Sequence, residues 1–202
     1  MSVKESSALV LLSGGMDSAV LLRYVKDVLE YDKIEALLFN YGQRHVIELN
    51  YAQVLANNLG VPYGTIYVDL GMFGGSSLTT EDDSLTVVVP ARNSIFLSLA
   101  TAYAETQGLQ DIFIGCNGED FADFPDCREQ FIRAMSQALA LGNNIQGVYA
   151  PFVNKSKSDI VKIGRSLGLS FQLTWSCYHP TDDGKPCGKC HACEEREAVL
   201  NE

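Results

Sequence analysis

The sequence has no run of apolar residues near the ~20 that a membrane-spanning helix requires. Basic residues are also scarce, because 15 Lys and Arg stand against 25 Asp and Glu and give a net charge of −10. Proteins that follow a nucleic-acid backbone need clustered cations, so this balance argues against that class. The first seven residues lack the basic and apolar blocks of a secretory signal. We therefore expect a cytoplasmic protein that binds neither a membrane nor nucleic acid.

Apolar residues make up 47% of the 202 residues and charged residues 20%, which is ordinary for one packed domain with a small appendage. Over the first two thirds of the chain, short apolar runs alternate with amphipathic helical segments. This alternation is typical of an α/β fold, with a doubly wound parallel sheet covered by helices on both faces. We expect strands at residues 8–12, 34–39, 64–68 and 111–115, a main domain over residues 1–173, and a tail over residues 174–202.

A glycine-rich loop follows the first expected strand: residues 13–18 read S-G-G-M-D-S, and a helical pattern comes next. Ligands of such sheets bind beyond the carboxyl ends of the strands. Glycines let the backbone approach an anion, and the free N–H groups at a helix start point toward it. The loop lacks the lysine of a Walker A motif and the spacing of the dinucleotide fingerprint. It therefore predicts a phosphate site of another class, with a simple turn in which Asp17 or Ser18 caps the helix as the alternative.

Four of the six cysteines crowd the C-terminal end in the pattern C-x9-C-x2-C-x2-C, which begins at Cys177. In a reducing compartment, such a cluster is more often a metal site than a disulfide framework. Four thiolates fill a tetrahedral shell and leave no position for water or substrate, which is typical of structural zinc. The alternatives are an iron–sulfur cluster, His179 or His191 in place of one cysteine, and reduced free cysteines.

The S-G-G-x-D-S loop resembles the pyrophosphatase loop of the N-type ATP pyrophosphatases, which split ATP into AMP and pyrophosphate. Together with the cysteine pattern, it resembles one family in that group, the 7-cyano-7-deazaguanine synthases (QueC). Four further blocks extend the resemblance over nearly the whole chain: N-Y-G-Q-R-H at 40–45, V-P-A-R-N at 89–93, G-C-N-G-E-D with P-D-C-R between 115 and 128, and T-W-S-C-Y at 174–178. Asn40 and Ala91 depart from the family pattern, which has Asp and Gly at those positions.

The resemblance implies an adenine-nucleotide α-hydrolase-like fold of the Rossmann type with a four-cysteine zinc-binding tail. It also implies a ligase that converts 7-carboxy-7-deazaguanine and ammonia to 7-cyano-7-deazaguanine through an amide, with two successive adenylations by ATP. The expected cofactors are one structural Zn²⁺ per chain and Mg²⁺ bound with ATP. The expected partners are these small molecules and a second copy of the chain in a homodimer.

The resemblance assigns roles to four groups of residues. The ATP site is expected at Leu12, Ser13, Gly14, Gly15, Met16, Asp17, Ser18, Ala19, Val20, Leu21, Leu22 and Phe39. The groups expected to act on the phosphate charge that develops during adenylation are Asp17, Ser18, Arg92 and Lys155. The loop after the fourth strand would bind the deazapurine through Asn117, Asp120, Phe121, Asp126 and Arg128. The zinc ligands would be Cys177, Cys187, Cys190 and Cys193.

Several assignments have alternatives. Asp126 can instead cap a helix that begins near Cys127, Phe124 can stack on the base, and Arg44 and His45 are further cations for the phosphate. The nearest alternative function is a related ligase that stops at the amide or activates another carboxylate. A zinc-containing nucleic-acid-binding module is a rival from another class, and the acidic tail argues against it.

Overall fold

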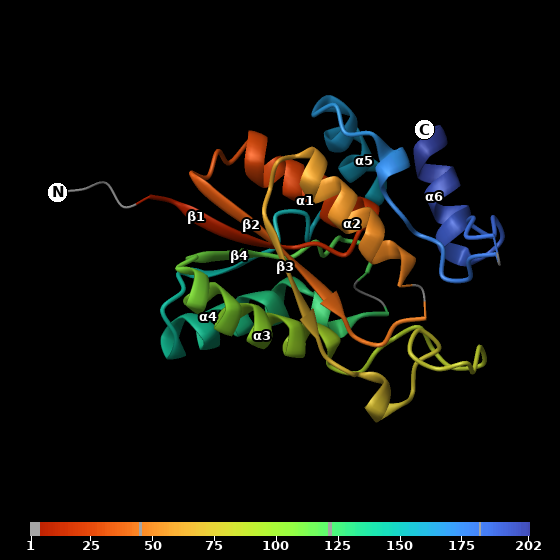
Figure 1. Cartoon of the computed structure of the whole chain (residues 1–202), viewed down its shortest axis with the longest axis horizontal. Coiled ribbons are helices and arrows are strands. Elements are labelled where there is room, and N and C mark those ends of the chain that lie inside the picture. Colours follow the sequence, from red (N-terminus) through yellow and green to blue (C-terminus); the bar gives the residue numbers. More distant parts are fainter. Residues whose placement is uncertain (1–4, 45, 121–122, 182) are drawn as a thin grey trace.

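A computed structural model describes residues 5–44, 46–120, 123–181 and 183–202. Within these ranges, the centre of the molecule is one parallel sheet of five strands in the order β3-β2-β1-β4-β5 (Figure 1). The strands are β1 (Ser7–Leu11), β2 (Lys33–Asn40), β3 (Tyr63–Tyr67), β4 (Asp111–Phe113) and β5 (Gly147–Tyr149). The strand order reverses between β1 and β4, so their carboxyl ends flank the position where such sheets bind ligands.

Helices cover both faces of this sheet (Figure 1). One face packs against α1 (Met16–Asp27), α2 (Ile47–Asn58), α5 (Lys157–Ser166) and a residue of α6 (His191–Asn201). The other face packs against α3 (Arg92–Gln107) and α4 (Glu129–Gly142). Short 3₁₀ turns lie at Gly71–Phe73, Pro125–Cys127 and Phe171–Leu173. This arrangement confirms the doubly wound α/β fold that the sequence predicts.

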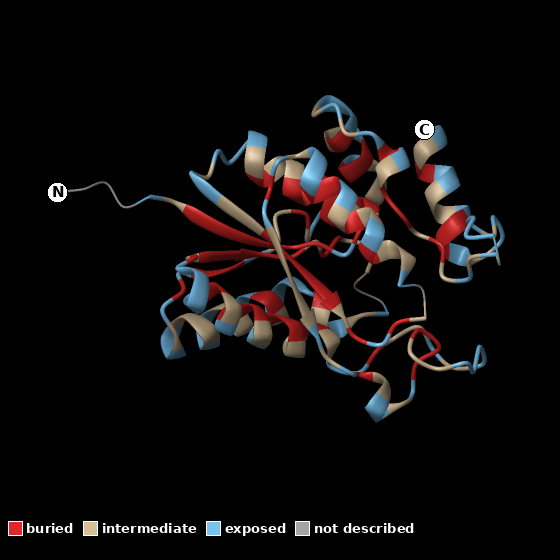
Figure 2. Ribbon diagram, viewed as in Figure 1, coloured by how far each residue is buried: buried red, intermediate tan, exposed pale blue. Residues whose placement is uncertain are grey.

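The central strand shows why the apolar runs form a buried sheet. Successive side chains of a strand point to opposite faces. Ala8 and Val10 of β1 pack into the layer of α1 and α2, whereas Leu9 packs into the layer of α3. All three side chains are fully buried, and Figure 2 shows burial along the central strands. A strand buried on both faces reads as a continuous apolar run, which is the pattern of its sequence.

The structure contains elements that the sequence patterns did not indicate. Strand β5 has only three residues, too few for a periodic signal, and β4 ends at Phe113 rather than at the expected residue 115. The sequence patterns also did not indicate helix α5 (Lys157–Ser166). None of the helices in the described ranges has the length and apolar character that a membrane crossing requires.

The C-terminal segment is more regular than its cysteine spacing suggests, because α6 forms directly after Cys190. Val199 of α6 joins the main apolar core, and the small cluster of Trp175, Cys177 and Cys193 packs against Ile47 and Tyr51 of α2. The division into a domain at 1–173 and a tail at 174–202 stays a prediction. These contacts place the segment firmly on the first part of the chain.

Candidate active site

The predicted phosphate loop lies at the carboxyl end of β1, between that strand and α1. Gly14 has a φ of +92°, and a Cβ built there would stand 2.2 Å from the carbonyl oxygen of Glu48, so only glycine fits. The hydroxyls of Ser13 and Ser18 are 3.0 Å apart. The Ser13 hydroxyl also accepts a hydrogen bond from the Gly15 amide at 3.2 Å. The loop is therefore fixed by its own short-range contacts and by its close approach to α2.

The start of α1 has no side-chain cap. Its N-cap residue is Gly15, and no side chain accepts a capping hydrogen bond there. The alternative in which Asp17 or Ser18 caps the helix is therefore wrong. The first amides of a helix carry a partial positive charge and favour an anion when no side chain satisfies them.

Asp17 is the acidic residue of this loop. Its carboxylate accepts a hydrogen bond of 2.8 Å from the side-chain amide of Asn117. Burial raises the pKa of Asp17 to about 6, and it outweighs the Asn117 hydrogen bond and the nearby Lys157, which both lower the pKa. Burial also raises the pKa of Asp120. The two carboxyls therefore lie in a place where a cation can be held.

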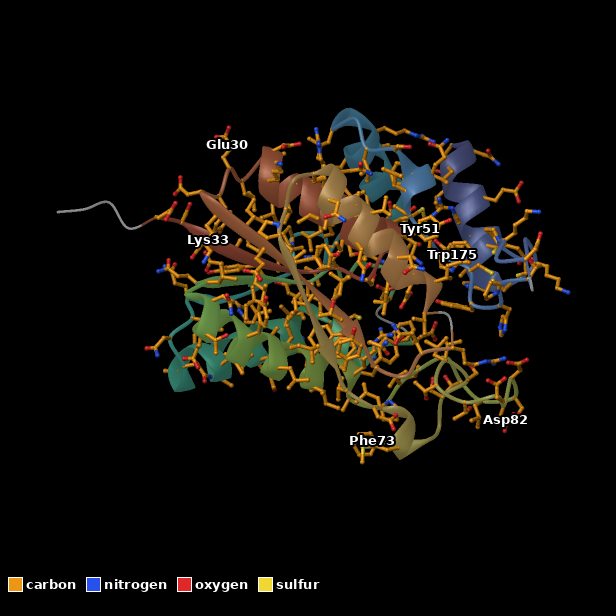
Figure 3. All side chains as sticks on the ribbon, viewed as in Figure 1. Glu30, Lys33, Tyr51, Phe73, Asp82 and Trp175 are labelled. Atoms are coloured by element: carbon orange, nitrogen blue, oxygen red, sulfur yellow. The ribbon has the colours of Figure 1, made fainter. Side chains whose placement is uncertain are left out.

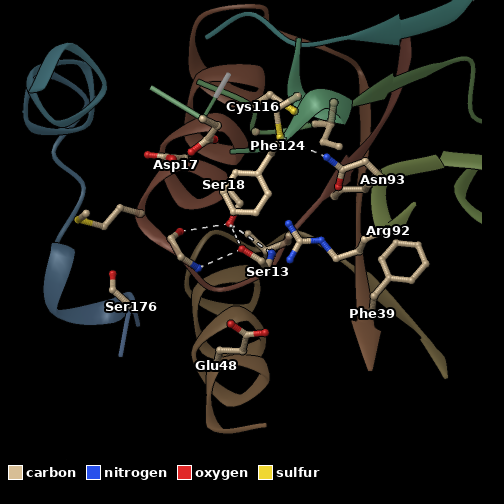
Figure 4. A pocket seen from close by; sticks show the side chains of 18 of the residues that line it. Ser13, Asp17, Ser18, Phe39, Glu48, Arg92, Asn93, Cys116, Phe124 and Ser176 are labelled. Atoms are coloured by element: carbon tan, nitrogen blue, oxygen red, sulfur yellow. Dashed lines mark hydrogen bonds between the residues drawn. The ribbon is translucent and has the colours of Figure 1, made fainter. Parts of the chain in front are cut away.

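A cavity of about 290 Å³ opens over the loop, which is close to the size range of small-molecule sites. It extends along the carboxyl ends of β1, β2 and β4 and reaches the C-terminal segment. Figure 4 shows part of its lining. The lining residues are Leu11, Leu12, Ser13, Gly15, Met16, Asp17, Ser18, Leu37, Phe39, Tyr41, Glu48, Leu78, Val87, Arg92, Asn93, Phe96, Ile114, Gly115, Cys116, Asp120, Phe124, Cys127, Lys157, Trp175, Ser176, Tyr178, Ala192 and Glu195.

The wall next to β2 is mainly apolar and aromatic. Phe39 and Phe96 stack with ring centroids 4.0 Å apart and an interplanar angle of 7°. Tyr41 lies against Phe96 and hydrogen-bonds with the side chain of Arg92. Burial raises the pKa of Tyr41, so its hydroxyl stays neutral beside the guanidinium. This wall presents flat apolar surface and one cation, Arg92 (Figure 4).

The wall between β4 and the C-terminal segment is charged. Lys157, at the first position of α5, forms an ion pair with Glu195 of α6. Burial opposes the charge of Lys157, but the contact with Glu195 and the charges of Asp17 and Asp120 together outweigh it and leave the pKa raised. Phe124 adds an aromatic ring to this wall. One cation, carboxylates and an aromatic ring therefore line the same cavity.

Many of the predicted site residues line the cavity, and others do not. The lining includes Leu12, Ser13, Gly15, Met16, Asp17, Ser18, Phe39, Arg92 and Asp120. Ala19, Val20, Leu21 and Leu22 are fully buried in the core. The residues absent from the lining are Gly14, Ala19, Val20, Leu21, Leu22, Asn117, Asp126, Arg128 and Lys155. Phe121 and His45 lie outside the described residues.

Asn117 and Asp126 instead hold parts of the site in place. Asn117 is fully buried, and its side-chain oxygen Oδ1 accepts hydrogen bonds from the backbone amides of Glu119 and Asp120 at 2.8 and 3.2 Å. The carboxylate of Asp126 accepts from the amide of Asn93 at 3.0 Å, in the first turn of α3. The alternative interpretation, in which Asp126 caps a helix that begins near Cys127, is therefore wrong, because Asp126 contacts the start of α3 instead.

Lys155 meets the site through its backbone, since its carbonyl oxygen accepts from the Gly118 amide at 2.8 Å. The lysine that lines the cavity is Lys157, which sequence reasoning missed. A usable signal was present, because Ser156 caps α5 by accepting from the Asp159 amide at 3.1 Å. A serine followed three residues later by an acidic residue marks a helix start, and it would have placed Lys157 at the first helical position.

The four predicted metal ligands meet at one point. The sulfur atoms of Cys177, Cys187, Cys190 and Cys193 all lie within 4.8 Å of one another. The Cys187 amide donates to the Cys177 sulfur at 3.3 Å. The backbone amides of Lys189 and Cys190 hydrogen-bond to Cys187 and help to lower its pKa to about 6. Neither His179 nor His191 belongs to this group, so the set that can hold a metal is four thiolates.

Trp175 connects this cluster to the phosphate loop. Its amide donates to the carbonyl oxygen of Gly14 at 2.8 Å, and its indole N–H donates to the carbonyl oxygen of Cys177 at 2.8 Å. Its ring lies 5.2 Å from that of Tyr51 on α2 (Figure 3). Arg196 of α6 donates to the hydroxyl of Thr174 at 2.7 Å. The cysteine segment is thus hydrogen-bonded to the loop through Trp175.

Comparison with known proteins places these features in one family. The family model described as "Queuosine biosynthesis protein QueC" matches residues 7–202. A protein of Frankia casuarinae is 41% identical over 97% of this chain and 90% of its own length. A protein of Thermoplasma acidophilum is 40% identical over 95% of this chain and 86% of its own length. Both carry the name 7-cyano-7-deazaguanine synthase.

Solved structures with low sequence identity share the fold. The NH3-dependent NAD synthetase of Campylobacter jejuni has a TM-score of 0.52 at 21% identity, over 85% of this chain and 68% of its own. The U34-tRNA thiolase NcsA of Methanococcus maripaludis, solved with its 4Fe-4S cluster, has a TM-score of 0.59 at 13% identity, over 98% of this chain and 74% of its own. At these identities the likeness concerns the fold alone.

Proposed function

The chain belongs to the QueC family, and from that premise we propose that it converts 7-carboxy-7-deazaguanine and ammonia to 7-cyano-7-deazaguanine, with ATP split to AMP and diphosphate. It is an enzyme, as its relatives of about 41% identity carry a synthase name. One observation supports the proposal most directly. A single cavity joins the S-G-G-x-D-S loop to the carboxylates, aromatic ring and lysine beside β4.

The proposed chemistry follows from the need for a leaving group. A carboxylate resists ammonia because its oxygen cannot leave as oxide. Adenylation makes that oxygen part of AMP, and ammonia displaces AMP to give the amide. A second adenylation on the amide oxygen, with loss of AMP, leaves the nitrile. One cavity can serve both rounds, because each round presents an oxygen to the α-phosphorus of ATP.

The phosphate loop would hold the departing pyrophosphate. The open amides at the start of α1 and the hydroxyls of Ser13 and Ser18 supply donors where negative charge grows. We assign the accompanying cations to Lys157, in place of Lys155, and to Arg92, because both line the cavity. Phe39 would lie beside the adenine, since stacked rings give that wall a flat apolar surface.

The cavity needs a divalent cation before it can hold a triphosphate. Its lining carries the carboxylates of Asp17, Glu48, Asp120 and Glu195, against the cations of Arg92 and Lys157. Partly buried carboxylates fit Mg²⁺, and we assign the ion to Asp17, the carboxylate that belongs to the loop itself. When bound, Mg²⁺ would neutralise phosphate charge.

The deazaguanine would bind on the charged wall. Asp120 can accept from the N–H edge of the base, and Phe124 can stack on the ring. Asn117 and Asp126 would act by fixing the loop that carries these two residues, since both hold backbone amides in this region.

The four cysteines would bind one structural Zn²⁺. Zinc thiolate bonds of about 2.3 Å bring four sulfurs to within about 4 Å of one another, and the observed sulfurs lie within 4.8 Å. An iron–sulfur cluster needs the sulfurs farther apart, because its iron and sulfide atoms lie between them. The four thiolates also leave no position for a substrate, so the metal would support the fold.

The reaction can be tested by supplying 7-carboxy-7-deazaguanine, ATP, Mg²⁺ and ammonium, and by following the base with mass spectrometry. We expect the amide to appear first and the nitrile to replace it. Supplying the amide with ATP but without ammonia should also give the nitrile. If the carboxylate reacts but the amide is inert, the protein is instead a related ligase that stops at the amide.

A further inference from the structure

Acidic residues contact both the backbone amide and the side-chain ammonium of Lys157. Its backbone amide donates to the carboxylate of Glu119 at 2.9 Å, which fixes the start of α5. Its side chain crosses to α6 and pairs with Glu195. The two side chains are only 16% and 27% exposed, so solvent screens the pair weakly. The lysine therefore has one defined direction in the cavity.

Glu195 comes from the helix that the cysteine cluster starts. Cys190 is the N-cap of α6, and the amide of Cys193 donates to the Cys190 carbonyl at 2.8 Å. Glu195 lies two residues beyond Cys193, on the part of α6 that lines the cavity together with Ala192. Glu195 therefore lies on a helix that begins within the four-cysteine segment.

The proposed reaction gives Glu195 no direct task. A carboxylate beside a triphosphate repels it, so any benefit has to arise through the lysine that the carboxylate holds. A lysine side chain loses rotamer freedom when it is fixed, and an existing ion pair can fix it before the substrate arrives. Protein kinases use such a pair, in which a glutamate on a movable helix orients the lysine that contacts ATP phosphates.

We propose that Glu195 is a positioning residue that aims Lys157 at the phosphate groups, and that α6 thereby couples the four-cysteine segment to phosphate binding. The inference rests on the proposed function in one respect, the placement of the ATP phosphates over the loop. It adds a residue that the reaction itself does not require and a route by which the cysteine segment affects turnover.

The first test compares Glu195→Gln with Glu194→Gln. Both changes remove one negative charge from the first turns of α6, but Glu194 is exposed and does not line the cavity. We expect Glu195→Gln to lower kcat by about tenfold, because a small displacement of a catalytic cation is costly. Glu194→Gln should match the unchanged protein. Equal metal content and equal Tm in both variants would show that the cysteine segment is intact.

The decisive test is the affinity for magnesium pyrophosphate, measured by calorimetry on the unchanged protein, Glu195→Gln, Lys157→Gln and the double variant. With Lys157 present, Glu195→Gln should weaken binding by about threefold or more, since the lysine loses its direction. With Lys157→Gln, the same change should strengthen binding, because only the repulsion by Glu195 remains to be removed. This reversal of sign is specific to a residue that acts through the lysine.

The outcomes separate this inference from the proposed function. If Glu195→Gln strengthens pyrophosphate binding in both backgrounds, Glu195 is only a repelling charge and the inference is wrong. If it has no more effect than Glu194→Gln, the ion pair is incidental and the inference is equally wrong. Failure of the unchanged protein to form nitrile while the reversal is observed would overturn the proposed reaction alone.

Discussion

The phosphate loop and the four-cysteine segment reach their shapes by different means. The loop is set by local chemistry, because a glycine with positive φ and two neighbouring hydroxyls fix its path. The cysteine segment has a small apolar cluster of its own, built on Trp175, Cys177 and Cys193. Its four sulfurs meet where a metal would bind them together. One region therefore depends on single residues, whereas the other would depend on the metal ion that we propose for it.

Among the changes that test this difference between the two regions, loss of a cysteine ligand should lower stability the most. Cys190→Ser should release the metal and lower Tm by about 10 °C or more, since metal binding supplies folding free energy to a segment with little core. Activity should fall as well, because Trp175 links the segment to the carbonyl of Gly14. Elemental analysis and a thermal scan check both points. Full metal content with unchanged Tm would show that Cys190 is not a ligand.

Gly14→Ala should be the next most severe change. An added Cβ meets the Glu48 carbonyl oxygen at 2.2 Å, and the φ of +92° is unfavourable for alanine, so we expect a loss of about 3 kcal/mol. Gly15→Ala is the matched control, because a Cβ there stands 3.4 Å from the nearest atom, the Ser13 hydroxyl oxygen. Urea unfolding would measure both. Equal losses for the two variants would contradict the steric account of the loop.

Asp17→Asn should raise stability while removing activity. Burial raises the pKa of Asp17 from 3.8 to about 6, so the ionised form costs folding free energy, and stability falls as pH rises through that range. Without nucleotide and Mg²⁺, the variant should melt several degrees higher at pH 8 and at the same temperature as the unchanged protein at pH 4. A higher Tm at both pH values would mean that the gain does not come from ionisation.

Trp175→Phe should have the smallest effect of this series. The change keeps most of the ring that packs near Tyr51 and removes the indole hydrogen bond to the Cys177 carbonyl. We expect a loss of about 1 kcal/mol and a few degrees in Tm, with metal content unchanged. A loss of the metal in this variant would show that metal binding also depends on the hydrogen bond from the Trp175 indole to the Cys177 carbonyl.

The sequence predicts best those features that depend on neighbouring residues. The loop at residues 13–18 and the cysteine spacing are local patterns: the loop forms between β1 and α1, and the four sulfurs come together, while the phosphate role of the loop stays a prediction. Strand β5 escaped prediction because three residues carry no period, and its pairing with β4 is set by contacts distant in sequence. For Lys157 a local signal existed in the Ser156 cap, but its ion pair with Glu195, 38 residues away, has no signal in the local sequence.

The placement of Asp126 could not be deduced from the sequence either. Its carboxylate meets the amide of Asn93, which is 33 residues earlier in the chain. A proline and an aspartate before a helix suggest a local cap, but the tertiary fold brings the start of α3 closer. Local capping rules do not describe contacts between separate helices.

The central claim is that the phosphate loop directs cleavage of ATP between its α and β phosphates during nitrile formation. The most direct measurement follows nucleotide and base products together in one reaction with 7-carboxy-7-deazaguanine, ATP, Mg²⁺ and ammonium. We expect AMP and diphosphate, with two AMP formed for each nitrile and one for each amide that accumulates. ADP and inorganic phosphate as the nucleotide products would contradict it.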